Sequence, residues 1–202
     1  MLLQTSPAGS HEDAPEVVVP RALMDRFLHR VSRVHAAGLK SFGLWVADPA
    51  DPAFPYRPSD VVFFDPKRNL RNAPGIRDSF HAQGSYFRSY DDAGFVADPA
   101  EVLAVDRQLE ARGLEPVALF HTHRRQPANF SHIDYRLHNP AYSWHLIVSL
   151  RDARQPVLRA FEVRKTLDDF GISPADANEG SEGDYQGPEV TPLTMVSDTR
   201  AA

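Results

Sequence analysis

Apolar residues recur at helical spacing in an early segment of this chain. From Leu23 to Val34 they fall on one helical face, so we predict a helix that begins near Pro20 and ends before Gly38. A second helix is predicted from Asp98, which can act as the N-cap ahead of the proline that follows it, to a closing glycine. The three predicted helices cover residues 20–38, 98–113 and 131–138.

Five further segments carry apolar residues over the length of a strand. The order along the chain is therefore α-β-β-α-β-α-β-β, which indicates a mixed α/β or α+β domain, although the pattern alone does not give the topology of the sheet. Residues 65–97 show no clear period, and we assign no element to them. The predicted strands cover residues 41–48, 60–64, 116–123, 144–150 and 158–164.

Both ends of the chain are poor in apolar residues. The length of 202 residues suits one domain. We expect residues 1–17 and 174–202 to form disordered tails. The folded domain would then cover residues 18–173.

The composition excludes several classes of protein. A formal net charge of -5 argues against a general nucleic-acid binder, which usually carries a basic excess. The absence of cysteine excludes disulfides and thiolate metal sites. No apolar run approaches the roughly 18 residues that a membrane span needs, and the N-terminal residues lack the pattern of a secretory signal. We therefore expect a soluble, cytoplasmic protein that does not bind membranes.

The most informative residues lie at the end of the third predicted strand and at the start of the helix after it. His121-Thr122-His123 ends that strand, and Ser131-x-x-Asp134 opens the short helix after it. Alternate residues of a strand point to the same side, so the two imidazoles can meet at one point, and Asp134 can add a carboxylate. Two histidines and one carboxylate suit zinc, with the fourth tetrahedral position left to water as in catalytic sites. We therefore predict a zinc site formed by these three side chains.

Each part of this pattern also has a purely structural interpretation. Ser131-x-x-Asp134 has the form of a helix capping box, with Asp in place of the usual Glu. A pair of histidines arises readily by chance in a chain that contains nine of them. The combination is more specific than either part, because a strand ends in the pair and a capped helix begins at a fixed distance from it. Ser131 can serve both purposes, since it can cap the helix and place its hydroxyl near water on the metal.

The same residues resemble the motif of the JAMM/MPN+ metallo-isopeptidases. In that family a glutamate lies upstream of His-x-His-Pro, and seven residues separate the second histidine from Ser-x-x-Asp. Here His121, His123, Ser131 and Asp134 have that spacing, and the order of elements across residues 20–164 fits the family's fold. The resemblance implies a single MPN-like domain, with a cytidine-deaminase-like layered arrangement of a mixed sheet flanked by helices.

The resemblance also implies an activity and a partner. Members of the family bind Zn²⁺ through the two histidines and the aspartate and hydrolyse a peptide or isopeptide bond, often beside the C-terminus of a ubiquitin-like protein. Bacterial members that resemble this compact size commonly process small ubiquitin-like sulfur-carrier proteins. Such a carrier protein is the partner that the resemblance implies.

The sequence departs from the family motif at two positions. Arg124 replaces the proline after the second histidine. The family's glutamate is expected three residues before Gly43, the small residue that opens the strand after the first helix, and Lys40 occupies that position. A lysine acts as a general base when its pKa falls towards neutrality, and burial and a nearby Zn²⁺ ion both lower it. Lys40 and Ser131 are therefore the candidate catalytic residues.

Another interpretation of the base stays open. Lys40 can instead be an exposed lysine at a strand edge with no part in the reaction. The proton acceptor would then be a carboxylate on or beside one of the predicted strands. The candidates are Asp60, Asp65, Glu115 and Glu162.

Four more residues near the motif have alternative interpretations. Arg124 and Arg125 can bind an anionic substrate group such as a C-terminal carboxylate, or can form an ordinary solvated loop. His138 can orient Asp134, although a role at the end of the short helix is favoured. His145, in the next predicted strand, is expected to contribute to packing.

Three functions fit the sequence. The first is an active hydrolase of the JAMM type. The second is a catalytically silent zinc-binding interaction domain, which the lysine in place of the glutamate favours, and the third is a small-molecule amide hydrolase that uses the same zinc. All three bind metal, so zinc content does not separate them, whereas turnover of a carrier-protein fusion separates the first from the second.

Overall fold

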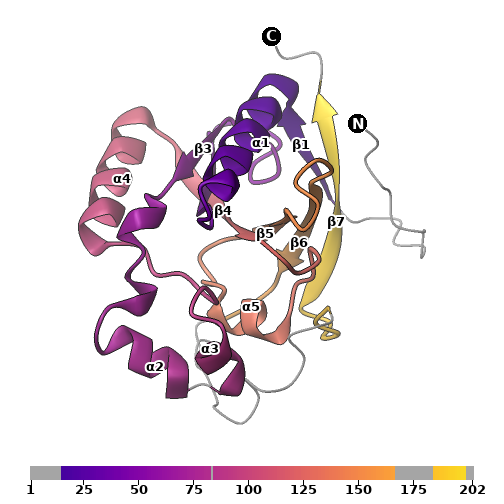
Figure 1. Ribbon diagram of the computed structural model, residues 1–202. Helices are drawn as coiled ribbons and strands as arrows, with labels where there is room; N and C mark the ends of the chain where they lie inside the picture. Colours follow the sequence, from indigo (N-terminus) through magenta and orange to yellow (C-terminus); the bar gives the residue numbers. More distant parts are fainter. Residues whose placement is uncertain (1–14, 83, 167–183, 199–202) are drawn as a thin grey trace.

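The computed structural model describes residues 15–82, 84–166 and 184–198 as a seven-stranded sheet with helices on both sides (Figure 1). The strand order across the sheet is β1-β7-β6-β5-β4-β2-β3. The strands are β1 (Glu16–Pro20), β2 (Phe42–Ala47), β3 (Asp60–Phe63), β4 (Glu115–His123), β5 (Trp144–Ser149), β6 (Val157–Val163) and β7 (Val190–Asp198). The helices are α1 (Arg21–Ala36), α2 (Ile76–Ala82), α3 (Ser85–Ser89), α4 (Pro99–Arg112) and α5 (His132–Leu137), with short 3-10 turns at Pro66–Arg68 and Leu70–Asn72.

The sheet is mixed. β4 is parallel to β5, and β1 is parallel to β7, whereas the other neighbouring strands are antiparallel. A mixed sheet flanked by helices in a single domain is the fold class that the sequence predicts, and this prediction is confirmed.

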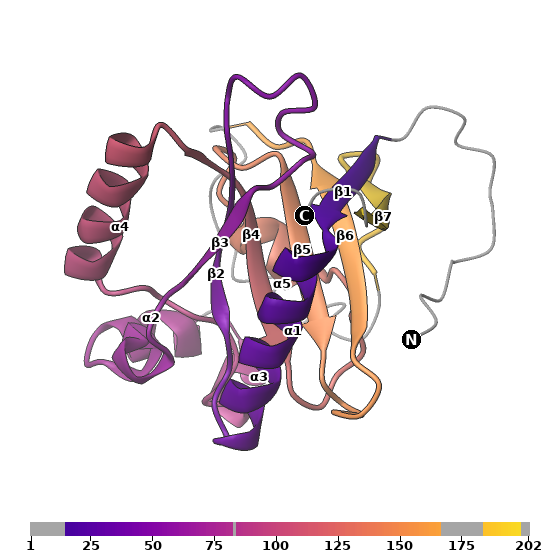
Figure 2. The same ribbon diagram turned by 90° about the horizontal axis from the view of Figure 1, so that it is seen from above.

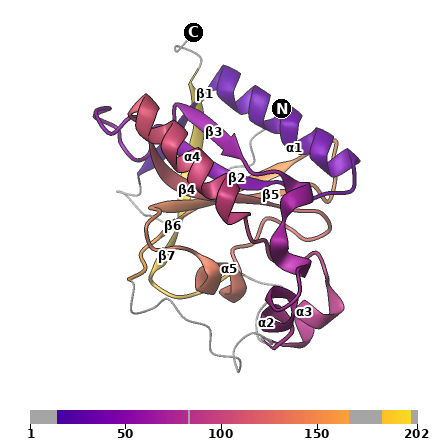
Figure 3. The same cartoon turned by 90° about the vertical axis from the view of Figure 1, so that its left-hand side faces the viewer.

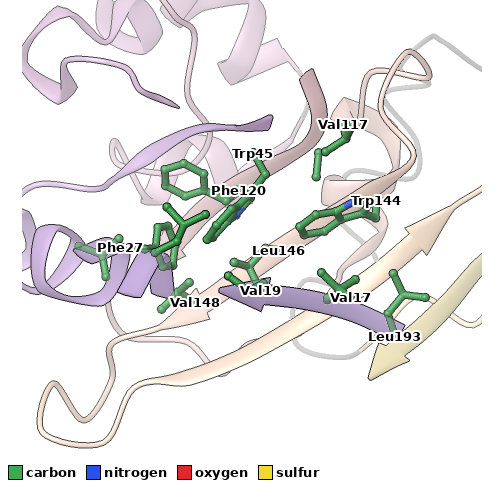
Figure 4. Close-up of a cluster of buried hydrophobic side chains, with 14 of the residues drawn as sticks. Val17, Val19, Phe27, Trp45, Val117, Phe120, Trp144, Leu146, Val148 and Leu193 are labelled. Carbon is green, nitrogen blue, oxygen red and sulfur yellow. The ribbon is translucent and has the colours of Figure 1, made fainter. Parts of the chain in front are cut away.

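The central strands are buried on both faces, which explains their continuous apolar runs. Every residue of β2 is buried. On one face Phe27 of α1 packs on Trp45 and Phe120, with ring centroids 4.8 and 5.0 Å apart, in the cluster that Figure 4 shows. Figure 2 shows α1 lying along this face of the sheet. α5 lies on the opposite side together with α2 and α3 (Figure 3), so this second face carries the short helices.

α4 begins and ends where the sequence predicts. The Asp98 carboxylate accepts a hydrogen bond of 2.8 Å from the N–H of Ala100, and Gly113 adopts a left-handed φ of 65° after the last turn. Val105 and Leu109 pack against the face of β2 that points away from α1. The helix therefore covers the sheet next to the end that carries β3.

All three predicted helices and all five predicted strands are present, with boundaries that differ by at most two residues. The segment that had no predicted element, residues 65–97, forms the two 3-10 turns, α2 and α3. In the described part of the chain, no helix has the length and apolar character that crossing a bilayer requires.

Two strands correct the predicted tails. β7 lies within residues 174–202, and β1 begins at Glu16, although we expected disorder in both regions. Residues 1–14, 167–183 and 199–202 lie outside the described residues, so the prediction is not tested there.

A proline explains why β7 is hard to predict. Pro192 interrupts the apolar pattern, and a proline within such a run argues against a strand. In the structure Pro192 pairs with Phe161 of β6, whereas β1 pairs with β7 only from Thr194 onward. Pro192 therefore lies in the half of β7 that has a neighbour on one side only, where a missing N–H is tolerated.

The position of β7 between β6 and β1 predicts that its buried side chain contributes to stability. Leu193 is 8% exposed and belongs to the main core. Leu193→Ala should lower the free energy of unfolding by about 2–5 kcal/mol, because buried methyl groups are removed and a cavity remains. Leu103→Ala on α4, where the side chain is 51% exposed, is the matched control and should stay within about 0.5 kcal/mol of the wild type. Urea denaturation measures both, and equally small effects would contradict the prediction.

Candidate metal centre

His121 and His123 lie at the C-terminal end of β4. There β4 pairs with β2, where Phe42 is opposite His121, and with β5 on its other side. Alternation along the strand places both imidazoles on the same face of the sheet. Thr122 between them points to the other face, where its hydroxyl oxygen accepts a hydrogen bond of 2.9 Å from the N–H of Ser41. The two imidazoles are therefore fixed by the sheet rather than by a loop.

Asp134 reaches the same point from the first turn of α5. Ser131 is the N-cap of that helix, and the reciprocal contacts of a capping box are both present. The N–H of Ser131 donates to Asp134 Oδ2 at 2.8 Å, and the Ser131 hydroxyl donates to the same oxygen at 2.6 Å. Because Oδ2 is satisfied in this way, the other carboxylate oxygen, Oδ1, faces the histidines.

The donor atoms of the three residues converge. His121 Nε2 lies 2.9 Å from His123 Nε2 and 3.3 Å from Asp134 Oδ1, and one donor atom from each residue lies within 4.8 Å of the others. His123 Nδ1 lies 2.7 Å from the carbonyl oxygen of Pro127, which can only accept, so Nδ1 carries the proton and Nε2 has a lone pair. When His121 Nε2 also presents a lone pair, two lone pairs and a carboxylate oxygen this close repel each other unless a cation lies between them. The donor set therefore fits a metal ion.

The electrostatic surroundings keep these groups in the form that binds metal. Burial, reinforced by His121, lowers the pKa of His123 to about 4. Burial alone would raise the pKa of Asp134, but the adjacent imidazoles of His121 and His123 outweigh burial and lower the pKa below the usual range. A neutral imidazole and an ionised carboxylate are the states in which these side chains ligate a metal.

The donor atoms line a narrow pocket of about 50 Å³. The ends of β2 and β4 form one side, α5 adds Ile133 and Leu137, and the segment from Tyr86 to Phe95 forms the opposite wall. A wider cleft of about 480 Å³ adjoins the pocket and shares His123 with it. The site is therefore both enclosed at its base and continuous with a larger surface cleft.

A buried guanidinium holds the wall of the pocket in place. Arg71 is 1% exposed and donates hydrogen bonds to the carbonyl oxygens of Ala93 at 2.7 Å and Phe87 at 3.0 Å. Its guanidinium carbon also lies 4.4 Å from the centre of the Phe80 ring. One side chain thus ties α2, α3 and the loop before α4 together.

The structure brings both candidate catalytic residues to the pocket. Lys40 and Ser131 line it together with the three donor residues. Arg124 and Arg125 line the adjoining cleft, which Lys40 also borders. The structure therefore gathers the three proposed ligands, the two candidate catalytic residues and the two arginines around one pocket and its mouth.

The four alternative carboxylates are placed elsewhere, and none of them lines the pocket. Asp60 pairs with an arginine of α4, and Asp65 caps the first 3-10 turn. Glu115 begins β4 and so lies at the far end of the strand from the histidines, and Glu162 accepts a hydrogen bond from a tyrosine hydroxyl. The hypothesis that one of them is the base therefore loses its structural support.

The sequence predicts other roles for two histidines beside the site. His138 is the C-cap of α5, as favoured, but its ring contacts His145 rather than Asp134. His145 was expected to pack, yet its Nε2 lies 2.8 Å from His121 Nδ1. Its face could be found only from the register of β5 against β4, in which His145 is opposite Leu119, on the same face as His121.

The model of the family described as prokaryotic homologs of the JAB domain matches residues 64–164, half of the chain, a stretch that contains the three donor residues and Ser131 but not Lys40. No curated protein matches the chain significantly.

The solved structures that resemble the chain include the following three. A protein of Desulfitobacterium hafniense aligns with a TM-score of 0.56 at 19% identity, over 90% of this chain and 92% of that one. A protein of Salinibacter ruber aligns with a TM-score of 0.51 at 17% identity, over 91% and 93%. A JAB1/MPN domain protein of Archaeoglobus fulgidus aligns with a TM-score of 0.41 at 12% identity, over 90% and 98%. The first two similarities support a shared fold.

The buried histidines predict that the metal-free protein loses stability on acidification. Burial lowers the pKa of His138 to about 4 from an ordinary value of 6.5. Between these values the unfolded chain takes up a proton that the folded chain rejects, so falling pH favours unfolding by up to about 1.4 kcal/mol per pH unit. The melting temperature should therefore fall from pH 6.5 to 4, and the fall should be shallower in His138→Gln. His29→Gln, at an exposed position of α1, should keep the wild-type slope; the same slope in His138→Gln would contradict this account.

Proposed function

Because the chain belongs to the family of prokaryotic homologs of the JAB domain, we propose that it is a zinc-dependent hydrolase of the JAMM type that cleaves a peptide or isopeptide bond. The observation that carries the proposal is the convergence of two imidazole nitrogens and one carboxylate oxygen at the end of β4, in a pocket beside a larger cleft.

His121, His123 and Asp134 would hold the zinc ion. Three protein donors of this kind leave a fourth tetrahedral position free, which is the arrangement of catalytic rather than structural zinc sites. Bound there, Zn²⁺ would act as a Lewis acid that polarises the amide carbonyl and activates water.

Ser131 would contribute its hydroxyl to the reaction. In this structure the hydroxyl donates to Asp134 Oδ2, which also accepts a hydrogen bond from the N–H of Ser131. Since the backbone hydrogen bond holds the carboxylate by itself, the hydroxyl can rotate towards a substrate oxygen without leaving Oδ2 unsatisfied. Ser131 would then stabilise the negative charge that develops on the carbonyl oxygen during attack.

Lys40 would move the proton. Burial is the largest influence on its pKa and lowers it; Asp92 and Asp134 oppose the shift, and Arg124 and Arg71 reinforce it. A neutral amine can accept a proton from the attacking water and return it to the leaving amine, which is the task of the glutamate in the family motif.

The adjoining cleft favours a substrate with an anionic group near the scissile bond. Arg124 and Arg125 line this cleft, and Arg124 Nε is buried without a hydrogen-bond partner among the described residues. A carboxylate would satisfy that nitrogen and pair with the guanidinium charge. Together with the family resemblance, this supports the C-terminal segment of a small ubiquitin-like, sulfur-carrier protein as the substrate.

A catalytically silent zinc-binding interaction domain is the second candidate. The observation that favours it is Lys40 at the position of the family's glutamate. Among the described residues that line the pocket, Asp134 is the only carboxylate, and it is a proposed ligand. Without a working lysine the site would bind zinc but transfer protons poorly.

Zinc analysis tests the metal centre. The purified protein should contain about one zinc ion per chain, held by three side chains. His121→Ala should lower the zinc affinity by more than the roughly 10–100-fold that loss of an outer hydrogen bond costs. His132→Ala is the matched control on α5, because the His132 ring packs 4.8 Å from Tyr185 instead of facing the site. Failure of the wild type to take up zinc on titration, or equal losses in both variants, would refute the metal centre.

Substitution of Lys40 tests the reaction. Lys40→Ala should reduce the turnover of a small carrier-protein fusion by about 10²–10⁴, because the proton acceptor is removed, while zinc content stays unchanged. Lys40→Glu should retain or raise the activity, because it restores the family's constellation. The rate of release of the C-terminal fragment, with zinc measured in parallel, provides the test.

The pattern across the three proteins separates the two candidate functions. Activity that appears only in Lys40→Glu would show that the wild type is silent towards this substrate. Equal activity in all three would show that Lys40 takes no part in proton transfer.

A further inference from the structure

We propose that His145 and His138 are positioning residues of the metal centre, which fix the ring tautomer in which His121 presents Nε2 to the metal. The inference rests on the metal site of the proposed function, and it concerns two histidines that the ligand motif does not include.

A line of close contacts runs behind His121. His121 Nδ1 lies 2.8 Å from His145 Nε2, and His145 Nδ1 lies 3.1 Å from His138 Nδ1. His138 Nε2 in turn lies 2.9 Å from the carbonyl oxygen of Tyr142. His138 is 0% exposed and His145 is 3% exposed, so these nitrogens exchange hydrogen bonds with one another rather than with solvent.

The carbonyl at the end of the line sets the position of every proton in it. The Tyr142 carbonyl can only accept, so His138 carries its proton on Nε2 and offers Nδ1 as an acceptor. His145 must then donate from Nδ1 and accept at Nε2. His121 consequently donates from Nδ1, which leaves the lone pair of its Nε2 for the metal.

Burial supports the assignment of a single proton to His138, because it lowers the pKa of that side chain to about 4. Phe130 lies against both rings, with centroids 5.3 Å from His145 and 6.5 Å from His138, and limits their rotation. The two outer rings are therefore held in one orientation.

The two proposed histidine ligands reach the same tautomer by different routes. His123 Nδ1 contacts a carbonyl directly, that of Pro127, whereas His121 depends on two intervening rings. Packing alone does not explain a histidine at position 145, because an apolar side chain would fill the same space without the cost of burying two polar ring nitrogens. The hydrogen bond to His121 does explain it, because an apolar side chain would leave the Nδ1–H of His121 buried and unpaired.

A matched pair of variants at His145 tests the proposal through zinc affinity. His145→Gln keeps an acceptor near the position of Nε2, whereas His145→Met fills a similar volume without one. We expect His145→Met to lower the zinc affinity about 10–100-fold and His145→Gln to stay close to the wild type. Competition with a chelator measures the affinity, and the melting temperatures of the metal-free proteins show whether each variant is folded. Wild-type affinity in His145→Met, or equal losses in both variants, would overturn the proposal.

The tautomers themselves provide a second measurement, which needs only the metal-free wild type. Long-range ¹H–¹⁵N NMR spectra should show protons on Nδ1 of His121 and His145 and on Nε2 of His138. A neutral His145 with its proton on Nε2 would overturn the proposal even if the variants fail to fold. If the wild type binds no zinc, the proposed function fails, whereas the spectra still decide whether the line of hydrogen bonds has the stated direction.

Discussion

The register of β4 between β2 and β5 is the constraint on which the site depends. It places His121 opposite Phe42, two residues after Lys40, and puts His145 on the same face of the neighbouring strand. A slip of one residue would turn both proposed histidine ligands to the face of the sheet that α1 covers. The core prevents such a slip, because Phe120 alternates with the ligands and packs in the cluster under α1. The apolar pattern that stabilises the sheet therefore also determines the face of the sheet on which the two imidazoles lie.

Each proposed ligand is held in its orientation by a hydrogen-bond contact with a different part of the fold. The Pro127 carbonyl orients His123, the β5 strand supplies the partner of His121, and the helix cap holds Asp134. α5 is itself anchored, because the buried Lys165 Nζ donates to three carbonyl oxygens at the C-terminal end of this helix, at 2.7 to 3.1 Å. Donors held in this way need little rearrangement when a metal arrives, which favours tight and specific binding.

The parts of the structure that could be predicted from the sequence are those with a local signal. His121, His123 and Asp134 could be found because a strand period and a helix cap fix them within a few residues of one another. His145 could not, since its relation to His121 follows from the register of two strands that are distant in sequence. β7 is not predicted because Pro192 interrupts its apolar pattern. The pocket wall is not predicted because its short helices are held by Arg71 and show no regular apolar period.

The dependence of the wall on Arg71 has a consequence for which parts of this pocket can vary. The donor residues are carried by β4 and α5, whereas the opposite wall of the pocket is organised by one guanidinium that binds the backbone carbonyls of Phe87 and Ala93. Because those contacts are to backbone atoms, the side chains of the wall can change without loss of its anchor. The side chains of the wall, and with them the preference for substrate, can therefore change while the metal-binding half of the pocket stays constant. The residues that carry the reaction and those that select the substrate lie on separately anchored parts of the pocket.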